Sequence, residues 1–207
     1  MCVAWVLSGI LGLVLGIVAG YFKDRLPDRL IRGYALLLAS TPAFWIGLLL
    51  LMIFAVWLGW LPFGMNLPAG MTAAEAGIGV RIRHLLLPAL TLGLTGVANI
   101  TLHTREKMIA IMESDYVLFA RARGESDWSI LRRHGLRNIL LPAMTLQFAS
   151  VSEIIGGSVL VEQVFSYPGL GQAAVTAGLG SDVPLLLGIT VVTAVIVAAG
   201  NLAANVL

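Results

Sequence analysis

The chain alternates between long segments without charge and short charged segments. Residues 1–22 carry no charged side chain, and about 20 apolar residues at about 1.5 Å each suffice to cross about 30 Å of hydrocarbon. Residues 33–74 are also uncharged but too long for one helix, and the Pro- and Gly-rich stretch that begins at Trp60 predicts a loop. We therefore predict an all-α integral membrane protein with a single domain, residues 1–207, and about five spans at 1–22, 33–61, 85–102, 138–161 and 183–207.

Composition agrees with a chain surrounded by membrane lipid. Hydrophobic residues make up 58% and charged residues 12%, whereas a soluble domain carries about 25% charged residues. A net charge of +2 gives no support to a nucleic-acid partner. Cys2 is the single cysteine, which excludes an intrachain disulfide. The three histidines fall at different levels of the predicted topology and there is no phosphate-binding glycine loop, so we expect neither a metal, a cofactor nor an ATP site.

Basic residues set the predicted orientation. Eleven of the 13 Lys and Arg residues lie in the segments 23–32 and 105–137, which five alternating spans put on one side. The positive-inside rule makes that side the cytosol, with Arg81 and Arg83 as the exceptions. The N-terminus is then outside and the C-terminus in the cytosol. Because the chain opens and closes on apolar residues without flanking charge, we expect a fragment of a longer protein.

The charged segment 104–137 is predicted to fold as two short cytosolic helices. Apolar residues from Glu106 to Arg123 recur at three- and four-residue steps and form one stripe. Gly124 can end that helix in the left-handed conformation. Ser126 or Asp127 can cap a second helix that runs from Trp128 to Arg137.

Two interpretations of the second helix remain open on the pattern. It could lie on the anionic membrane surface, held by its arginines. Alternatively, it could be a docking helix that exposes Trp128, Leu131 and His134 to a groove in a cytosolic partner, while basic neighbours steer the encounter.

The segment from Tyr116 to Pro142, YVLFARARGESDWSILRRHGLRNILLP, resembles the cytosolic "EAA" loop of ATP-binding-cassette importer permeases. In that family an Ala-rich stretch, a fixed Gly and a later Leu-Pro form a loop that docks on the ATPase subunit. The stretches STPAFWIGLLL, LLLPALTLG and GGSVLVEQVFSYPGLG extend the resemblance over nearly the whole chain. The chain is most similar to B-type permeases of the dipeptide/oligopeptide/nickel branch. Phe119 replaces the acidic residue that names the loop, and Tyr167 stands where Trp is expected.

The resemblance implies a type I importer-like fold in the inner membrane of a prokaryote. It implies four kinds of partner: a homologous C-type permease subunit, two cytosolic ATP-binding subunits, an external substrate-binding protein and membrane lipid. The chain itself would not be an enzyme, and its substrate would be a peptide, nickel or another small solute. Family members also carry an N-terminal span and a C-terminal tail. Pattern and resemblance together give these candidate residues for ATPase coupling: Ala120, Ala122, Gly124, Trp128, Leu131, Arg132, Arg133, His134, Arg137 and Pro142.

Polar residues inside the predicted spans are the other candidates, because ionisable groups are costly in a membrane. Glu153 could face a substrate pathway or be buried between helices. Glu162 is expected to serve as a gate or a structural hydrogen-bond acceptor. The turn containing Tyr167, Pro168 and Gly169 could cap the pathway from outside or be only a turn. Glycines at 9, 12, 16 and 20 predict close helix packing by the first span.

Two other functional classes fit the sequence less well. An intramembrane enzyme would need convergent catalytic groups, and Glu153 has no His or second carboxylate at a comparable depth. A secondary transporter or channel would not need the charged segment 104–137.

Overall fold

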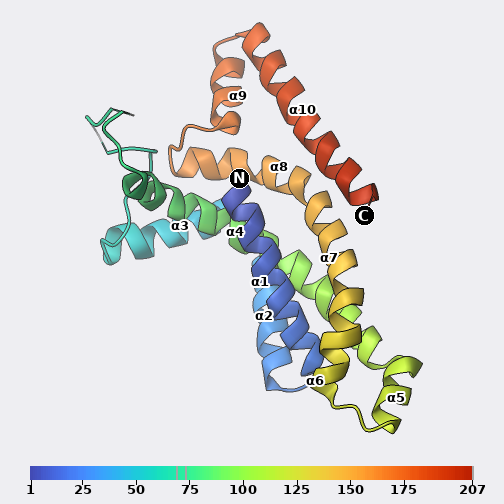
Figure 1. Cartoon of the computed structure of the whole chain (residues 1–207). Coiled ribbons are helices and arrows are strands. Elements are labelled where there is room, and N and C mark those ends of the chain that lie inside the picture. Colours follow the sequence, from blue (N-terminus) through green and yellow to red (C-terminus); the bar gives the residue numbers. More distant parts are fainter. Residues whose placement is uncertain (69, 73, 207) are drawn as a thin grey trace.

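The computed structural model describes residues 1–68, 70–72 and 74–206, and for His134 the main chain only. All regular elements within these residues are helices, as the sequence predicts (Figure 1). In chain order they are α1 (Cys2–Tyr21), α2 (Leu26–Ala39), α3 (Ala43–Leu50), the π-helix η1 (Leu51–Trp57), α4 (Ile78–Met112), α5 (Asp115–Ala122), α6 (Asp127–Ile130), the π-helix η2 (Leu131–Gly135), α7 (Leu136–Ala149), α8 (Val151–Val164), α9 (Leu170–Leu179) and α10 (Val183–Val206).

The 35-residue helix α4 is the centre of the bundle, since it packs against α1, α2, α3, α7 and α8. Its closest neighbour is α1, which approaches through glycines. A Cβ atom on Gly12 would lie 2.7 Å from the Cβ of Ile100, and one on Gly16 would lie 2.5 Å from the Cβ of Thr104. The close packing predicted from the glycine spacing is therefore confirmed. These two helices form a tight pair on which the other elements assemble.

Three described helices, α1, α4 and α10, are long and apolar enough to cross a membrane, and two bent pairs raise the number to five if each pair is one span. One pair is α2 with α3 and η1, bent by 106°. A single continuous helix over 33–61 is therefore wrong. Ser40 and Thr41 turn their hydroxyls back to the carbonyls of α2, and Pro42 disfavours helical geometry at Thr41.

The other bent pair, α7 with α8, covers the predicted span 138–161 and bends by 46° at Ser150. The prediction of one helix over 106–123 is wrong, because α4 continues to Met112 and α5 begins after Ser114 in extended geometry. The predicted helix over 128–137 does not end at Arg137. It continues through η2 into α7, so no loop separates it from the following apolar helix.

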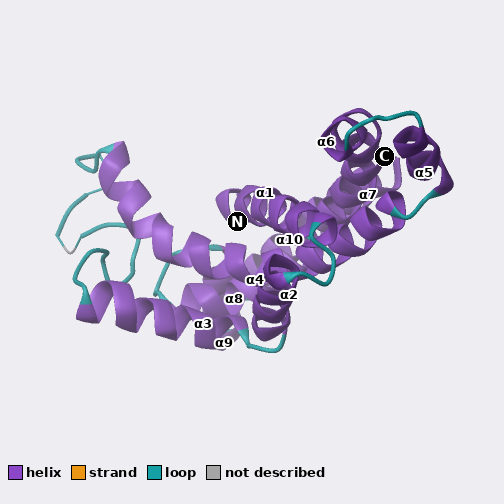
Figure 2. Ribbon diagram, turned by 90° about the horizontal axis from the view of Figure 1, so that it is seen from below, coloured by secondary structure: helices purple, strands orange, loops and turns teal. Residues whose placement is uncertain are grey.

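The bundle has two distinct ends, which we call the hairpin end and the loop end (Figure 1). The hairpin end carries α5 and α6; the loop end carries the described residues between η1 and α4 (58–68, 70–72 and 74–77), α9 and the start of α10. Viewed from below, α5 and α6 lie well apart from α3 and α9 (Figure 2). At the loop end, Met65 N–H donates to the Phe165 carbonyl at 2.8 Å, and a Cβ on Gly64 would lie 2.1 Å from that oxygen. The long loop is thus fixed to the end of α8.

Candidate functional site

The hairpin that joins α5 to α6 turns at Gly124, whose φ is +84°. No atom would lie within 4 Å of a Cβ at this position, so backbone conformation rather than space favours glycine. Glu125 N–H donates to the Ala120 carbonyl at 3.1 Å, which closes the end of α5. The Ser126 hydroxyl accepts from Ser129 N–H at 3.3 Å. The predicted left-handed turn and the predicted Ser126 cap are both confirmed.

Buried apolar side chains hold the hairpin together and fix it to the bundle. Val117, Ala120 and Ile130 form one small core between α5 and α6. Leu131 packs with Met108 of α4 and Ile139 of α7 in a second. The prediction that Leu131 is exposed for docking is wrong, because it is 5% exposed and contacts the bundle.

The most exposed large apolar side chains of α5 and α6 are Leu118 at 64%, Phe119 at 69% and Trp128 at 66% exposure. We call these three residues the apolar tip. The exposure of Trp128 agrees with the docking interpretation of the second helix, whereas the exposure of Leu118 and Phe119 was not predicted. The adjacent pair Leu118–Phe119 carried the missed signal, since two neighbouring residues of an eight-residue helix point in directions about 100° apart. An exposed apolar cluster in a charged segment is typical of an interaction site.

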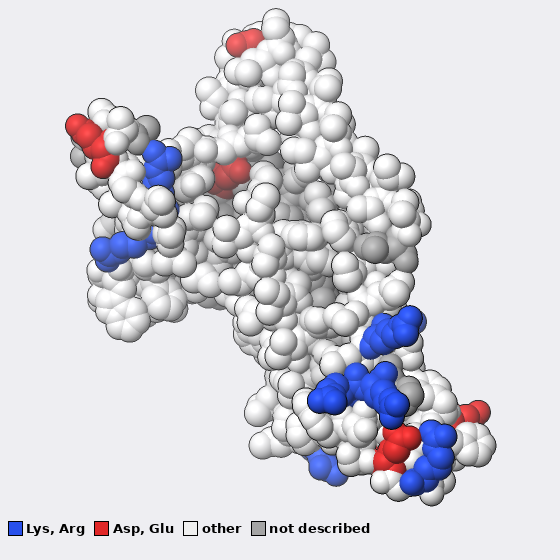
Figure 3. All heavy atoms as spheres, in the orientation of Figure 1, with Lys and Arg blue, Asp and Glu red and all other residues white. Residues whose placement is uncertain are grey.

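The remaining coupling candidates lie around this tip. Ala122, Gly124, Arg132, Arg133 and Arg137 are exposed, Ala120 is buried, and Pro142 is half-buried inside α7; the side chain of His134 lies outside the described residues. Most of the basic side chains visible in Figure 3 gather at the hairpin end, and a smaller group lies at the loop end.

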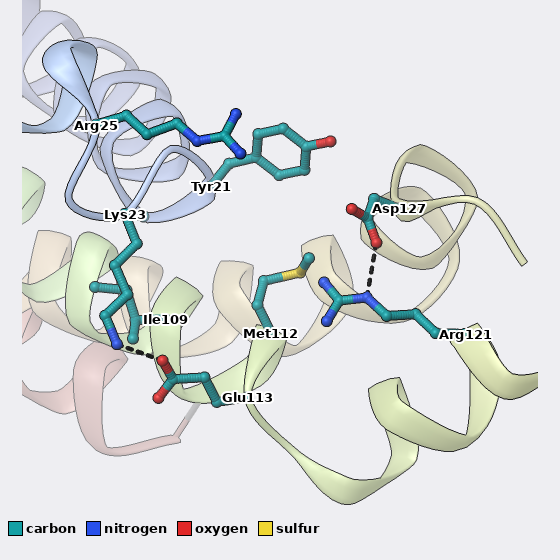
Figure 4. A pocket seen from close by; sticks show the side chains of 9 residues that line it. Tyr21, Lys23, Arg25, Ile109, Met112, Glu113, Arg121 and Asp127 are labelled. Atoms are coloured by element: carbon teal, nitrogen blue, oxygen red, sulfur yellow. Dashed lines mark hydrogen bonds and ion pairs between the residues drawn. The ribbon is translucent and has the colours of Figure 1, made fainter.

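A cavity of about 300 Å³ separates the hairpin from the turn between α1 and α2 (Figure 4). Lys23 forms an ion pair with Glu113 across it, and Arg121 donates to Asp127 at 2.8 Å. The hydrogen bond to the Glu113 carboxylate raises the pKa of Lys23 above its ordinary value. Both pairs are exposed to solvent, and such pairs contribute little to stability. Only the pair of Arg121 with Asp127 lies within the hairpin, which the apolar contacts hold together.

A buried ion pair that the sequence did not reveal lies beside this end. Arg105 of α4 donates to both carboxylate oxygens of Asp28 at 2.5 and 2.7 Å. Asp28 is fully buried in the first turn of α2 and also accepts from Asp24 N–H at 2.8 Å. The pair ties the start of α2 to α4.

Glu162 joins α8 to α9 at the loop end. Its side chain is 7% exposed, and its carboxylate accepts from Gln172 N–H at 2.9 Å in the first turn of α9. A carboxylate at a helix N-terminus is favoured by the helix dipole. A Cβ on Gly169 would lie 2.3 Å from the same carboxylate, so glycine leaves room for it. Tyr167 N–H donates to the Glu162 carbonyl at 2.9 Å, and Pro168 is exposed beside it. Glu162 thus accepts a structural hydrogen bond, which was one of its two predicted roles.

Glu153 lies in the first turn of α8, just after the bend at Ser150. Its side chain is exposed, so the alternative prediction that Glu153 is buried between helices is wrong for the helices of this chain. The polar residue Asn99 of α4 is exposed as well.

Replacing Gly171 with valine is expected to detach α9 from α8. A Cβ at this position would lie 2.7 Å from the Cα of Val159, and overpacking of this kind costs about 1–3 kcal/mol. Thermal unfolding of the full-length protein in detergent measures the loss. Gly178→Val is the matched control in the same helix, because no atom would lie within 4 Å of its Cβ. Equal losses in both variants would contradict the Glu162 contact as described.

The described residues form a helical bundle whose helices can cross a membrane, with a charged hairpin that exposes apolar side chains at one end. The family model for the binding-protein-dependent transport system inner membrane component matches residues 12–207, and the chain belongs to this family. The predicted resemblance to importer permeases is thereby confirmed.

Relatives agree with this assignment. The chain is 39% identical over 204 residues to the oligopeptide transport system permease protein AppB of Bacillus subtilis (strain 168), covering 97% of this chain and 64% of that protein. It is 36% identical over 177 residues to the glutathione transport system permease protein GsiC of Escherichia coli (strain K12), covering 86% of this chain and 54% of that protein. The chain therefore spans between about half and two thirds of the length of these curated relatives.

Proposed function

We propose that this chain forms the membrane part of a permease subunit in an ATP-driven importer of peptides. The observation that carries the proposal is the apolar tip, Leu118, Phe119 and Trp128, on a hairpin of a family member. The relatives are named for oligopeptide and glutathione transport, which supports a peptide-like solute. The proposed partners are two ATP-binding subunits at the hairpin end, a second permease subunit and an external binding protein.

The orientation in the inner membrane follows from the same proposal. The hairpin end, where most Lys and Arg gather, faces the cytosol, which agrees with the positive-inside rule (Figure 3). The N-terminus of this chain then faces outward. The loop end, where Glu162 accepts a hydrogen bond from the start of α9, contacts the external binding protein.

Coupling uses the continuity between the hairpin and the bundle. An ATPase subunit that grips the apolar tip would move α6, and α6 continues through η2 into α7 without a loop. Motion is then delivered to the bend at Ser150 and to Glu153, which follows the bend and faces the pathway. ATP hydrolysis takes place on the partner, and this chain contributes the mechanical connection.

Replacing Leu118 and Phe119 together with alanine is expected to weaken ATPase binding by about 2 kcal/mol or more, about 30-fold, as for exposed anchors at an interface. Because both side chains are exposed, the fold should be retained. Co-purification of the ATPase subunits and peptide uptake are measured with the full-length permease in its complex.

Leu179→Ala is the matched control, because Leu179 is 85% exposed at the loop end. Unchanged ATPase binding and uptake in the Leu118→Ala/Phe119→Ala variant would overturn the docking role. Uptake that persists without ATPase subunits would favour a secondary transporter or channel instead.

A further inference from the structure

One face of α4 carries polar side chains that no other element covers. Asn99, His103 and Glu106 are all exposed. Steps of four and three residues put them on one side of the helix. The opposite side, with Thr104 and Met108, is closed by the glycines of α1. Among the described residues, neither Asn99 nor His103 has a hydrogen-bond partner.

Helix α8 brings Glu153 to the same side of the bundle. Where the two helices cross, a Cβ on Gly157 would lie 3.8 Å from Leu92 Cδ2. Leu92 is seven residues from Asn99, about two turns along the same face of α4. From this crossing α4 runs toward the hairpin end through Asn99, and α8 reaches Glu153 four residues in the same direction. Both polar side chains therefore lie on the hairpin side of the crossing.

Contact of this polar face of α4 with lipid hydrocarbon would be unfavourable. Asn99 lies within a helix that is long and apolar enough to span a membrane, and Glu153 belongs to a bent pair that passes the same test. Ionisable and polar groups at such positions face a water-filled cavity or other protein, since exposure to hydrocarbon is costly. The lipid-facing character of α1 differs clearly, because its exposed side chains include Ile10 and Val14.

We propose that the α4 face with Asn99 and His103, together with Glu153 and Gly156 of α8, is the water-lined wall of the translocation pathway, and that Glu106 lies at its cytosolic mouth. This inference rests on the proposed function and specifies which side of the chain the solute passes. Gly156 belongs to the same open face, since no atom would lie within 4 Å of a Cβ there, and a neighbouring permease surface is the alternative that the test has to separate from a water-lined wall. The second permease subunit then stands across the pathway from this wall.

The test is thiol accessibility in the full-length permease assembled with its partners. Cys2 is first replaced with serine, as is any other cysteine of the full-length protein. Asn99→Cys and Gly156→Cys then probe the wall, and Val14→Cys and Val195→Cys are controls on α1 and α10, where these residues are 52% and 62% exposed. A charged, membrane-impermeant thiol reagent needs the thiolate in contact with water. We expect both wall positions to react at least about tenfold faster than both controls, and their rates to change on adding ATP.

Reaction of the wall positions at the rate of the controls would overturn the inference in favour of lipid contact. Unreactive wall positions in the complex that become reactive in the isolated subunit would overturn it in favour of a permease–permease interface. ATPase co-purification and uptake of the cysteine-free background are measured in parallel. Failure of the proposed function would appear as loss of ATPase co-purification and uptake. A complex that transports peptide while the wall positions stay unlabelled would contradict only the inference about the wall.

Discussion

Replacing Arg105 with alanine is expected to destabilise the protein by about 3–5 kcal/mol. The substitution leaves the carboxylate of Asp28, which is fully buried, without the guanidinium that donates to both of its oxygens. A buried charge without its partner costs far more than the net contribution of the pair. Unfolding of the full-length protein in detergent, followed by loss of helical circular dichroism, provides the measurement.

Lys23→Ala is the matched control for this prediction. It also removes a basic partner from a carboxylate near the hairpin end, but the pair of Lys23 with Glu113 is exposed. We expect it to cause a much smaller loss than Arg105→Ala, because an exposed pair is screened by solvent. Replacing both Asp28 and Arg105 with leucine should be much less harmful than Arg105→Ala alone. Equal effects of Arg105→Ala and Lys23→Ala would contradict the buried pair.

The second large effect is expected at Gly16, where a single added methyl group forces α1 from α4. Its carbon would lie 2.5 Å from the Cβ of Thr104 and 2.8 Å from the carbonyl oxygen of Thr101. Both are fixed parts of α4, so neither can rotate away, and we expect Gly16→Ala to cost about 3 kcal/mol, at the upper end of overpacking penalties.

The same substitution at Gly188 of α10 should have the opposite sign. No atom lies within 4 Å of a Cβ there, and alanine is the better helix former by about 1 kcal/mol. Thermal unfolding of the two variants side by side measures the difference. A stabilised Gly16→Ala variant would show that α1 and α4 do not approach each other as closely as described.

Local signals predicted the parts of the fold that depend on few residues. Uncharged length predicted helices at α1 and α10, Gly124 predicted the turn of the hairpin, and the spacing of glycines predicted the contact between α1 and α4. Each follows from conformational preference or chain geometry within one segment. The positions of the spans relative to a bilayer remain predictions.

The errors have physical causes that lie outside such signals. The bend after α2 lies within an uncharged segment, where hydropathy does not change. Pro42 is the only residue there that indicates a break in the helix. Leu131 was wrongly predicted to be exposed because the pattern of one segment does not show that Met108 of α4 and Ile139 of α7 cover it. Asp28 and Arg105 are 77 residues apart, and nothing in either segment indicates that they meet. The structural hydrogen bond of Glu162 was predicted, but its partner, Gln172 N–H in the first turn of α9, was not.

The continuous helical segment formed by η2 and α7 has the geometry of a lever arm. Residues 131–149 form a rod of about 28 Å at about 1.5 Å per residue. A tilt of about 10° around Ser150 would carry Leu131 through about 5 Å, an arc comparable to one helical turn. A continuous helix converts a displacement of Leu131 into a tilt at Ser150. A flexible tether at the same place would absorb the displacement before it reached Glu153. Under the coupling proposed above, rigidity between the ATP-binding partner and the bend at Ser150, rather than any group with chemical reactivity, is what the sequence from Leu131 to Ala149 has to preserve.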